Sequence, residues 1–302
     1  MKRSGLVFAI LATVISADAG AIYVTTAGAL RIPLSVQQAG IGGLEVVGDD
    51  PAAGWRNPSL LSGQRQQWVL SGLGGSMFGG ETTNVGIAGG YKVNDRLGLA
   101  LILMSSGGSF EEVDGAGALT GTTVRQATSA CGVILSGKVG SALSLGATGK
   151  LVRDEVMGDR AAAPLCDLGA LIHLSSVDVG VAILNMGGKL RNSPSFWQDN
   201  FPPADASVGV AWNLGAGIRL AGETTILIEG LAVERLGLEW RPIEIFAMRI
   251  GAAGPDGSFS RARGSAGLSV SWRHLQFDYA FQSALSQASH EIGLTVAFDS
   301  IH

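Results

Sequence analysis

Alternation of apolar residues with small or polar ones runs through most of the chain from Gln67 onward. A period of two is the pattern of a β-strand whose two faces meet different surroundings. The clearest stretch is 263–298, which holds three such segments in succession. Their apolar positions are Ala266, Leu268, Val270 and Trp272, then Leu275, Phe277, Tyr279 and Phe281, then Ile292, Leu294, Val296 and Phe298. The sequence therefore predicts an all-β fold for residues 67–302.

The second face of these segments carries Gly, Ala, Ser and Thr with very few charges, although a soluble sandwich or propeller would expose charged residues there. Charged residues make up 15% of the chain, against about 25% in ordinary soluble domains. The 45 glycines are about twice the usual share of about 7%. Glycine weakens an ordinary sheet but suits a curved wall or leaves room inside it. These features predict a transmembrane barrel with a small-residue lumen and an apolar outer face.

Counting the alternating segments gives about fourteen strands in an antiparallel barrel. Short links alternate with longer ones at 107–121, 157–165, 187–206, 254–262 and 283–289. Bacterial barrels have short periplasmic turns, longer external loops and an even number of strands. The expected strands are 67–78, 82–93, 95–106, 122–137, 141–156, 166–174, 177–186, 207–214, 217–230 (read as two, broken near Gly222), 235–241, 244–253, 263–272, 274–282 and 290–298.

The N-terminus has the pattern of an export signal. Lys2 and Arg3 precede the apolar run 6–15, and Ala17-Asp18-Ala19 follows it. A basic start, a short apolar core and an A-x-A site are typical of a secretory signal peptide. The apolar run is too short to span a bilayer as a helix. We therefore expect residues 1–19 to be cleaved, and the bacterial outer membrane, with its lipid, to surround the mature protein.

Residues 20–66 differ from the rest of the chain because they lack strand alternation. Asp49-Asp50-Pro51 suits a helix start, with Asp50 as the cap and Pro51 in the first turn. Asn57-Pro58 predicts a turn or a second helix start. The small inward residues of the predicted wall leave space in the lumen. We therefore predict that 20–66 forms a plug inside the barrel, with its motif residues Asp49, Asp50, Pro51, Asn57 and Pro58.

The segment 40–63, GIGGLEVVGDDPAAGWRNPSLLSG, resembles the start of the PorV/PorQ-type barrels of the FadL/OMPP1/TodX superfamily. The patches 237–240, 248–251 and 277–280 resemble the closing strands of that family. The resemblance implies a fourteen-stranded barrel with an N-terminal plug. It departs at Ser59, where the family has Ala, and at 299–302, which follow the terminal aromatic residue. The chain is shorter than typical fatty-acid transporters, so their ligand residues are not carried over.

Five ionisable residues of the C-terminal strands fall on the inward face by alternation. One interpretation is a charged constriction that shapes the lumen. The other, which we favour, is a set of structural salt bridges, since opposite charges on neighbouring strands stabilise a sheet and intramembrane ionisable groups usually pair. We also predict that the plug's 49–58 stretch lies against three of these charges, Glu239, Arg241 and Arg249. The five residues are Glu239, Arg241, Arg249, Asp278 and Glu291.

Nothing in the sequence points to catalysis, a cofactor or a metal. There is no G-x-S-x-G or H-E-x-x-H motif, although His290 could face Ser286 or Ser289 at the rim. Cys131 and Cys166 fall on the outward face of strands separated by another strand, so we expect free thiols. With a net charge of −4 and scattered basic residues, nucleic acid is not a predicted partner.

The predicted function is therefore non-enzymatic. We expect a FadL-like passage for small hydrophobic molecules. The family resemblance leaves open an alternative, a PorV-like accessory barrel whose external loops, such as 187–206, bind protein partners in type IX secretion. The outward aromatic residues are expected to form the membrane-interface girdle; they are Tyr91, Trp212, Trp240, Trp272 and Tyr279.

Overall fold

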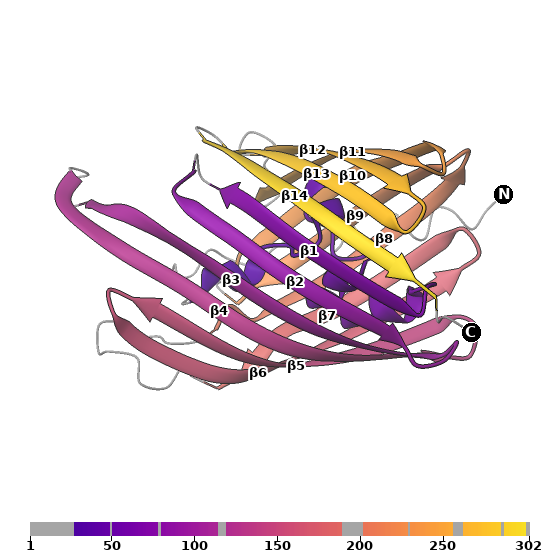
Figure 1. Ribbon diagram of the computed structural model, residues 1–302, viewed down its shortest axis with the longest axis horizontal. Coiled ribbons are helices and arrows are strands. Elements are labelled where there is room, and N and C mark those ends of the chain that lie inside the picture. The colour runs from indigo at the N-terminus through magenta and orange to yellow at the C-terminus, as the bar shows by residue number, and fades with distance from the viewer. Residues whose placement is uncertain are drawn as a thin grey trace.

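A computed structural model shows fourteen antiparallel strands closed into one barrel, with β1 hydrogen-bonded to β14 (Figure 1). It describes residues 27–48, 50–77, 80–113, 119–188, 202–228, 230–255, 262–284 and 287–299. The strands are β1 Trp68–Met77, β2 Thr82–Lys92, β3 Leu97–Val113, β4 Leu119–Val139, β5 Leu143–Val156, β6 Asp159–Leu174, β7 Val177–Gly187, β8 Asp205–Gly215, β9 Ile218–Leu227, β10 Ala232–Ile243, β11 Phe246–Pro255, β12 Arg263–Trp272, β13 Leu275–Ala284 and β14 Gln287–Phe298. The predicted fold class is confirmed.

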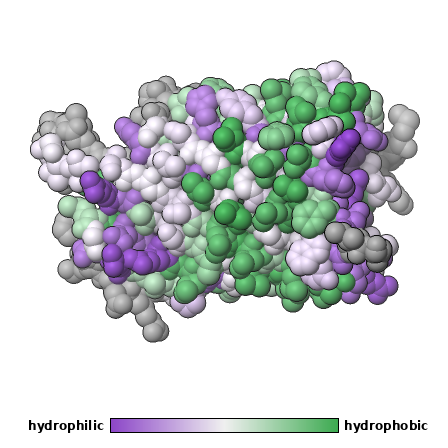
Figure 2. Space-filling view, viewed as in Figure 1, coloured by the Kyte–Doolittle hydropathy of each residue, from purple (hydrophilic) through white to green (hydrophobic). Residues whose placement is uncertain are grey.

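The outer face of the barrel is a belt of large apolar side chains. Leu101 is 52% exposed, and every second residue of the flanking strands is similarly apolar and exposed. Figure 2 shows this belt as a broad green zone with hydrophilic atoms at both ends of the molecule. Such a surface is stable only in lipid, so the protein is an outer-membrane barrel. Among the described residues, no helix is long and apolar enough to cross a membrane.

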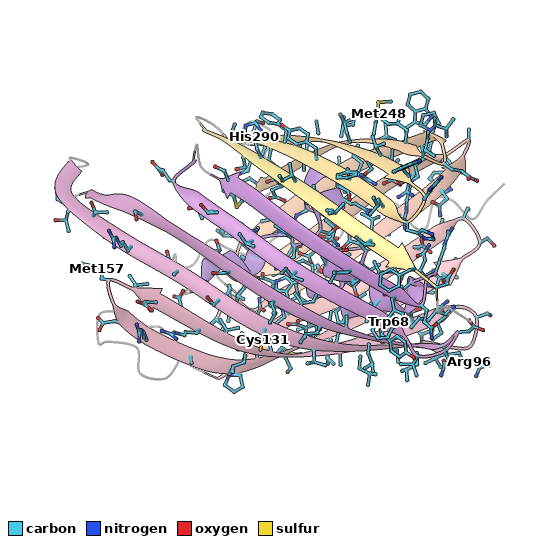
Figure 3. All side chains as sticks on the ribbon, in the orientation of Figure 1. Trp68, Arg96, Cys131, Met157, Met248 and His290 are labelled. Carbon is cyan, nitrogen blue, oxygen red and sulfur yellow. The ribbon has the colours of Figure 1, made fainter. Side chains whose placement is uncertain are left out.

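Aromatic residues gather on the outer face at the end that holds the short turns 93–96, 140–142, 175–176, 216–217, 244–245 and 273–274, called here the short-turn end. Trp68 and Tyr91 lie there with ring centroids 4.3 Å apart. Trp212, Trp240 and Trp272 are exposed close to the same turns. Figure 3 shows Trp68 and Arg96 at this end and Met157 at the other. The arrangement is that of an interfacial girdle.

The strand boundaries correct two expectations. The segment 217–230 is one strand, β9, and not two: Gly222 pairs without a break with Val210 and Leu236. The loops expected at 107–121 and 157–165 are mostly strand, because β3, β4 and β6 continue far beyond the apolar belt (Figure 1). In the β4 extension, residues 120–123 are exposed on both faces. In the β6 extension, Ala161 and Ala163 are buried and Ala162 is exposed, so the same side chain stands on both faces. Apolar alternation, the signal used to find strands, is therefore lost in these extensions.

The N-terminal segment lies inside the barrel (Figure 1). It is called here the plug segment, residues 27–66, and Asp49 within it lies outside the described residues. Its short helices are η1 Gly28–Arg31, α2 Val36–Gly40, η2 Pro51–Trp55 and η3 Pro58–Gly63. Helix α2 contacts β11 to β14, η2 contacts β1 to β3, and η3 contacts β3 to β6. The segment is thus packed against much of the inner wall.

Glycines of the wall lie directly beneath the plug segment. A Cβ on Gly146 of β5 would stand 2.3 Å from the carbonyl carbon of Pro58, and one on Gly251 of β11 would stand 2.3 Å from that of Ile41. Real Cβ atoms essentially never approach backbone this closely. The inward glycines therefore admit the backbone of the plug segment, which accounts for part of the glycine content.

Candidate functional site

The inner face of β1 to β6 carries a band of apolar side chains, called here the apolar band. It joins plug residues such as Leu30, Leu34, Trp55 and Leu61 in one buried cluster. Lumen faces of transmembrane barrels are ordinarily polar, so a continuous apolar surface here is distinctive. The band comprises Leu73, Ala88, Ala100, Ile102, Met104, Ala130, Ile134, Val152, Ala163 and Leu165.

The opposite side of the plug segment is held by buried ion pairs. Arg56 pairs with Glu45 within the segment and lies 3.8 Å from Asp205 of β8. Arg31 pairs with the same Asp205 at 2.7 Å. Ser207 of β8 donates to Glu45 at 2.7 Å. Arg31 is partly exposed, but Glu45, Arg56 and Asp205 are almost fully buried. Removing one partner of the Glu45–Arg56 pair would therefore leave an uncompensated buried charge, which costs about 3–5 kcal/mol.

A second wall group extends this network toward β9 and β10. The Glu223 carboxylate of β9 accepts hydrogen bonds from the backbone N–H groups of Glu45 and Val46, at 2.7 and 3.1 Å. Arg235 of β10 pairs with Glu223 at 3.1 Å. The six ionisable residues Arg31, Glu45, Arg56, Asp205, Glu223 and Arg235 are called here the anchor network. Three carboxylates face three guanidinium groups, so the network is balanced in charge.

The plug members of the network are held in their charged forms. Burial raises the pKa of the Glu45 carboxyl, but the charges of Arg56 and Arg235 and the hydrogen bonds from Arg56 and Ser207 outweigh burial. The pKa of Glu45 therefore lies below its ordinary value. Burial lowers the pKa of Arg56, but Glu45 and Asp205 raise it more. The Glu45–Arg56 pair thus stays ionic inside the barrel.

Four of the five predicted lumen charges come together. Glu239 of β10 pairs with Arg241 at 2.9 Å and with Arg249 of β11 at 2.6 Å. Arg249 lies 3.9 Å from Asp278 of β13. Glu291 is buried on β14 and takes no part in these contacts. The geometry is that of the favoured interpretation, salt bridges across neighbouring strands, and any role in passage stays a prediction.

Residues of the plug segment lie beside this cluster. The plug residues that line the small gap beside Glu239, Arg241 and Arg249 are Gln37, Gln38, Ile41, Val47 and Gly48. Among the motif residues, Pro51 lies beneath Gly90 of β2 and Asn57 beneath Gly169 of β6. Asp50 lines one cavity together with Arg241, and Asp49 lies outside the described residues. Contact between the 49–58 stretch and these charges therefore stays a prediction.

Local capping gives the motif residues a structural role in the plug segment. The Asp50 carboxylate accepts from the backbone N–H of Ala53 at 3.0 Å and from the Ser35 hydroxyl at 2.6 Å. Pro51 opens η2, as the sequence predicted. Asn57 caps η3 through the backbone N–H of Ser59 and precedes Pro58. The motif thus builds two short helices and ties η2 to Ser35 at the start of α2.

Sequence reasoning missed the anchor network and a second buried pair. Lys150 of β5 pairs with Asp167 of β6 at 2.7 Å and lies 4.0 Å from the ring centroid of Trp55. Strand alternation would have placed Lys150, Asp205, Glu223 and Arg235 inside. No periodic signal exists for the plug partners, so the pairing itself had no sequence signature.

Two adjacent cavities lie beneath the plug segment at the short-turn end, with volumes of about 320 and 460 Å³. Both are lined by Gly63, Arg65 and Arg241. One also includes His274 and Gln276, and the other His173 and Asp178. These polar linings suit water, so the cavities form an aqueous vestibule below the plug segment.

The remaining candidate residues have structural surroundings. Cys131 and Cys166 are free thiols exposed on the outer face of β4 and β6, as predicted, and Figure 3 shows Cys131 there. His290 lies in β14 and not in a loop, and its Nδ1 is 2.8 Å from the Tyr279 hydroxyl on the outside. Ser289 points inward and is buried. No group of three metal-ligating side chains occurs among the described residues.

The fold and lumen define a class: a fourteen-stranded outer-membrane barrel with a folded N-terminal segment in its lumen. Solved structures share this fold. The toluene transporter TodX of Pseudomonas putida matches with a TM-score of 0.70 and 12% identity, over 87% of this chain and 98% of that one. The monoaromatic hydrocarbon channel CymD matches with a TM-score of 0.68 and 14% identity, over 89% and 98%. No protein-family model and no curated protein matches the sequence.

Proposed function

We propose that this protein is a non-catalytic passage for small hydrophobic molecules across the outer membrane. The observation that carries the proposal is the apolar band on the inner face of β1 to β6. Transfer of an apolar solute from one apolar surface to another costs little free energy. Its burial is stabilised by about 25 cal/mol for each Å² of its apolar surface that is removed from water. A polar pore would offer no such path. The fold is shared with CymD, named a monoaromatic hydrocarbon channel, and with TodX, named a toluene transporter.

The plug segment is proposed to act as the gate of this passage. Leu30, Leu34, Trp55 and Leu61 cover the apolar band, so a solute must displace them to move along it. A hydrophobic solute can replace these contacts with its own apolar surface. A hydrophobic solute cannot replace the ion pairs of the anchor network on the opposite side. Passage is therefore proposed to run between the plug segment and β1 to β6, while the anchor network stays formed.

The secretion-accessory role has no comparable support. Its proposed binding loop, 187–206, lies largely outside the described residues. The signal peptide 1–19 also lies outside them, and its cleavage stays a prediction. The motif residues and the lumen charge cluster are proposed to shape the plug and its polar side.

Uptake of N-phenylnaphthylamine, an uncharged aromatic dye excluded by an intact outer membrane, tests the passage. Cells that express the protein should take up the dye several times faster than cells with an empty vector. Uptake of a small sugar should not change. Equal dye uptake in both strains, with assembled barrel confirmed by heat-modifiable mobility, would contradict the proposal.

A disulfide lock tests the gate. In a Cys131→Ala, Cys166→Ala background, Pro51→Cys with Gly90→Cys places two Cβ atoms about 3.1 Å apart on the apolar side. Val46→Cys with Gly180→Cys gives about 3.3 Å on the opposite wall. Disulfides prefer about 3.5–4.5 Å, so a small shift closes either bond. Oxidation should block dye uptake only in the first protein, and reduction should restore it. Unchanged uptake in the oxidised first protein would contradict the proposed route.

A further inference from the structure

Two buried polar side chains face the lumen without partners where β14 closes on β1. Neither carboxylate oxygen of Glu291 has a hydrogen-bond partner, and neither polar atom of the Asn84 side chain has one. Glu291 is 1% exposed and Asn84 is 0% exposed. Among the described residues, Glu291 forms no salt bridge. Buried polar groups are nearly always paired in proteins, so each exception needs a cause.

The two side chains stand on either side of one glycine. Gly75 of β1 pairs with Glu291 of the neighbouring strand β14 on one side and with Asn84 of the neighbouring strand β2 on the other. Two strand spacings, about 9.5 Å, therefore separate the β14 and β2 backbones here. A Cβ on Gly75 would lie 2.7 Å from Cγ of Glu291. The Glu291 side chain thus lies over Gly75 and leans toward β2, where Asn84 stands.

The surroundings of this pair are apolar on β1 and β13, whereas Ser106 of β3, the register partner of Asn84, and Thr82 of β2 contribute buried hydroxyl groups. Leu73 and Met77 are the inward residues next to Gly75 on β1, and both are buried. Ala280 is paired with Glu291 on β13 and is fully buried. Leu34 of the plug segment reaches within 3.3 Å of a Cβ position at Gly86, the next inward residue after Asn84. The pair therefore stands at the edge of the apolar band, away from the vestibule.

We propose that Glu291 and Asn84 bind the polar head of an otherwise apolar cargo, a hydroxyl or amino group that donates a hydrogen bond. A carboxylate accepts such a bond, and the Asn84 amide can either donate or accept in a second one. The ring or chain of the cargo then lies along the apolar band. This inference rests on the proposed passage and narrows its substrate class.

The same geometry disfavours acids. A cargo carboxylate beside Glu291 would place two acidic groups side by side in a buried site, where the ionisation of both is costly. A hydrogen bond to a charged group contributes more than an ordinary one. The site is thus expected to prefer an aromatic alcohol over the matching hydrocarbon by about tenfold or more, and to reject the matching carboxylate.

Three probes of one skeleton test this preference: naphthol, methylnaphthalene and naphthoate. Binding to the purified full-length barrel in detergent is measured by equilibrium dialysis, with the micelle background subtracted. Naphthol should bind about tenfold more tightly than methylnaphthalene, and naphthoate most weakly. Glu291→Gln should reduce the discrimination against naphthoate, because the amide carries no charge and can donate. Asn84→Leu should reduce the preference for naphthol. Ser289→Ala, on the same face of β14, is the matched control and should change neither.

Equal binding of all three probes by the wild-type protein, or binding of none, would overturn the inference, because the buried pair would then hold only water. Neither result decides the passage itself, which is judged separately by dye uptake. Uptake with no probe selectivity would leave a passage without a head-group site. The heat-modifiable band of each variant shows that its barrel has assembled. Glu291→Gln changes the carboxylate and Asn84→Leu removes the amide, so the two variants test the two halves of the proposed site separately.

Discussion

Replacement of Gly146 by alanine tests whether the wall glycines seat the plug segment. The added Cβ would stand 2.3 Å from the Pro58 carbonyl carbon and 2.5 Å from the Ser59 nitrogen. Ordinary contact is 3.4–4 Å, so wall or plug must move by about 1 Å. Both obstacles are backbone atoms of η3, which cannot rotate away as a side chain would.

The matched control is Gly149→Ala on the same strand. A Cβ there meets nothing within 4 Å. Both changes share the backbone effect of replacing glycine in a strand, worth about 0.5–1 kcal/mol in favour of alanine. Overpacking costs about 1–3 kcal/mol and applies only to Gly146. The two variants should therefore differ by about 1–3 kcal/mol, or about 5- to 150-fold in the population of the undocked plug.

Trypsin cleavage after Arg56 measures that population, because this residue is 2% exposed while the plug segment is docked. In detergent, with the barrel band intact, the fragment should appear faster in Gly146→Ala than in wild type. It should appear no faster than wild type in Gly149→Ala. Equal cleavage rates in the two variants would refute the idea that glycine space seats the segment.

Further outcomes follow from the outer face and the anchor network. Leu101→Arg should cost about 2–4 kcal/mol of barrel stability if it lies near the bilayer midplane, whereas Val139→Arg at the short-turn end should cost about 0–1 kcal/mol; urea titration in lipid measures both. Cys131 and Cys166 should both react with a lipid-soluble maleimide and show no mutual disulfide in a non-reducing peptide map. Because the pKa of Glu45 is lowered from 4.5, its contribution to docking should be complete above pH 4.5 and lost only as pH falls through the lower folded value. Hydrogen exchange of the peptide containing Arg56 would show this, and loss of protection between pH 7 and 5 would contradict it.

Alternation was sufficient to predict the barrel because lipid imposes it. Leu97, Leu99, Leu101 and Leu103 sit opposite Gly98 and Ala100 on one strand, and the structure keeps that arrangement. Where lipid ends, the constraint ends, and the extensions of β3, β4 and β6 were predicted as loops. Alternation along each strand also predicted which charged residues face the lumen, because the residues between the lipid-facing positions must point inward.

The plug segment shows where local reasoning stops. Its caps at Asp50 and Asn57 are local hydrogen bonds, and the sequence predicted both helix starts. Its position against the wall depends on residues far apart in the chain, such as Glu45 with Ser207. The acidic 49–58 stretch is expected to meet arginines of the wall, and that contact stays a prediction, whereas the cap at Asp50 is observed. Glu45, a carboxylate that pairs with Arg56, carried no motif to mark it.

The anchor network and the apolar band make the two sides of the plug segment unequal, and Arg56→Met separates their roles. Removing this guanidinium leaves Glu45 without its buried partner, at about 3–5 kcal/mol, so the segment should detach from β8 and β9 as well as from the apolar band. The lumen would then open to water from both sides. In proteoliposomes, a small sugar should enter faster through Arg56→Met than through wild type, and deletion of the whole plug segment should have a larger effect of the same sign. Arg153→Met, an exposed residue of β5 whose side chain is 53% exposed, is the control and should leave sugar entry unchanged. If Arg56→Met admits no more sugar than this control while its barrel is assembled, the ion pairs do not hold the polar side closed. The passage would then lack the asymmetry that restricts it to apolar molecules.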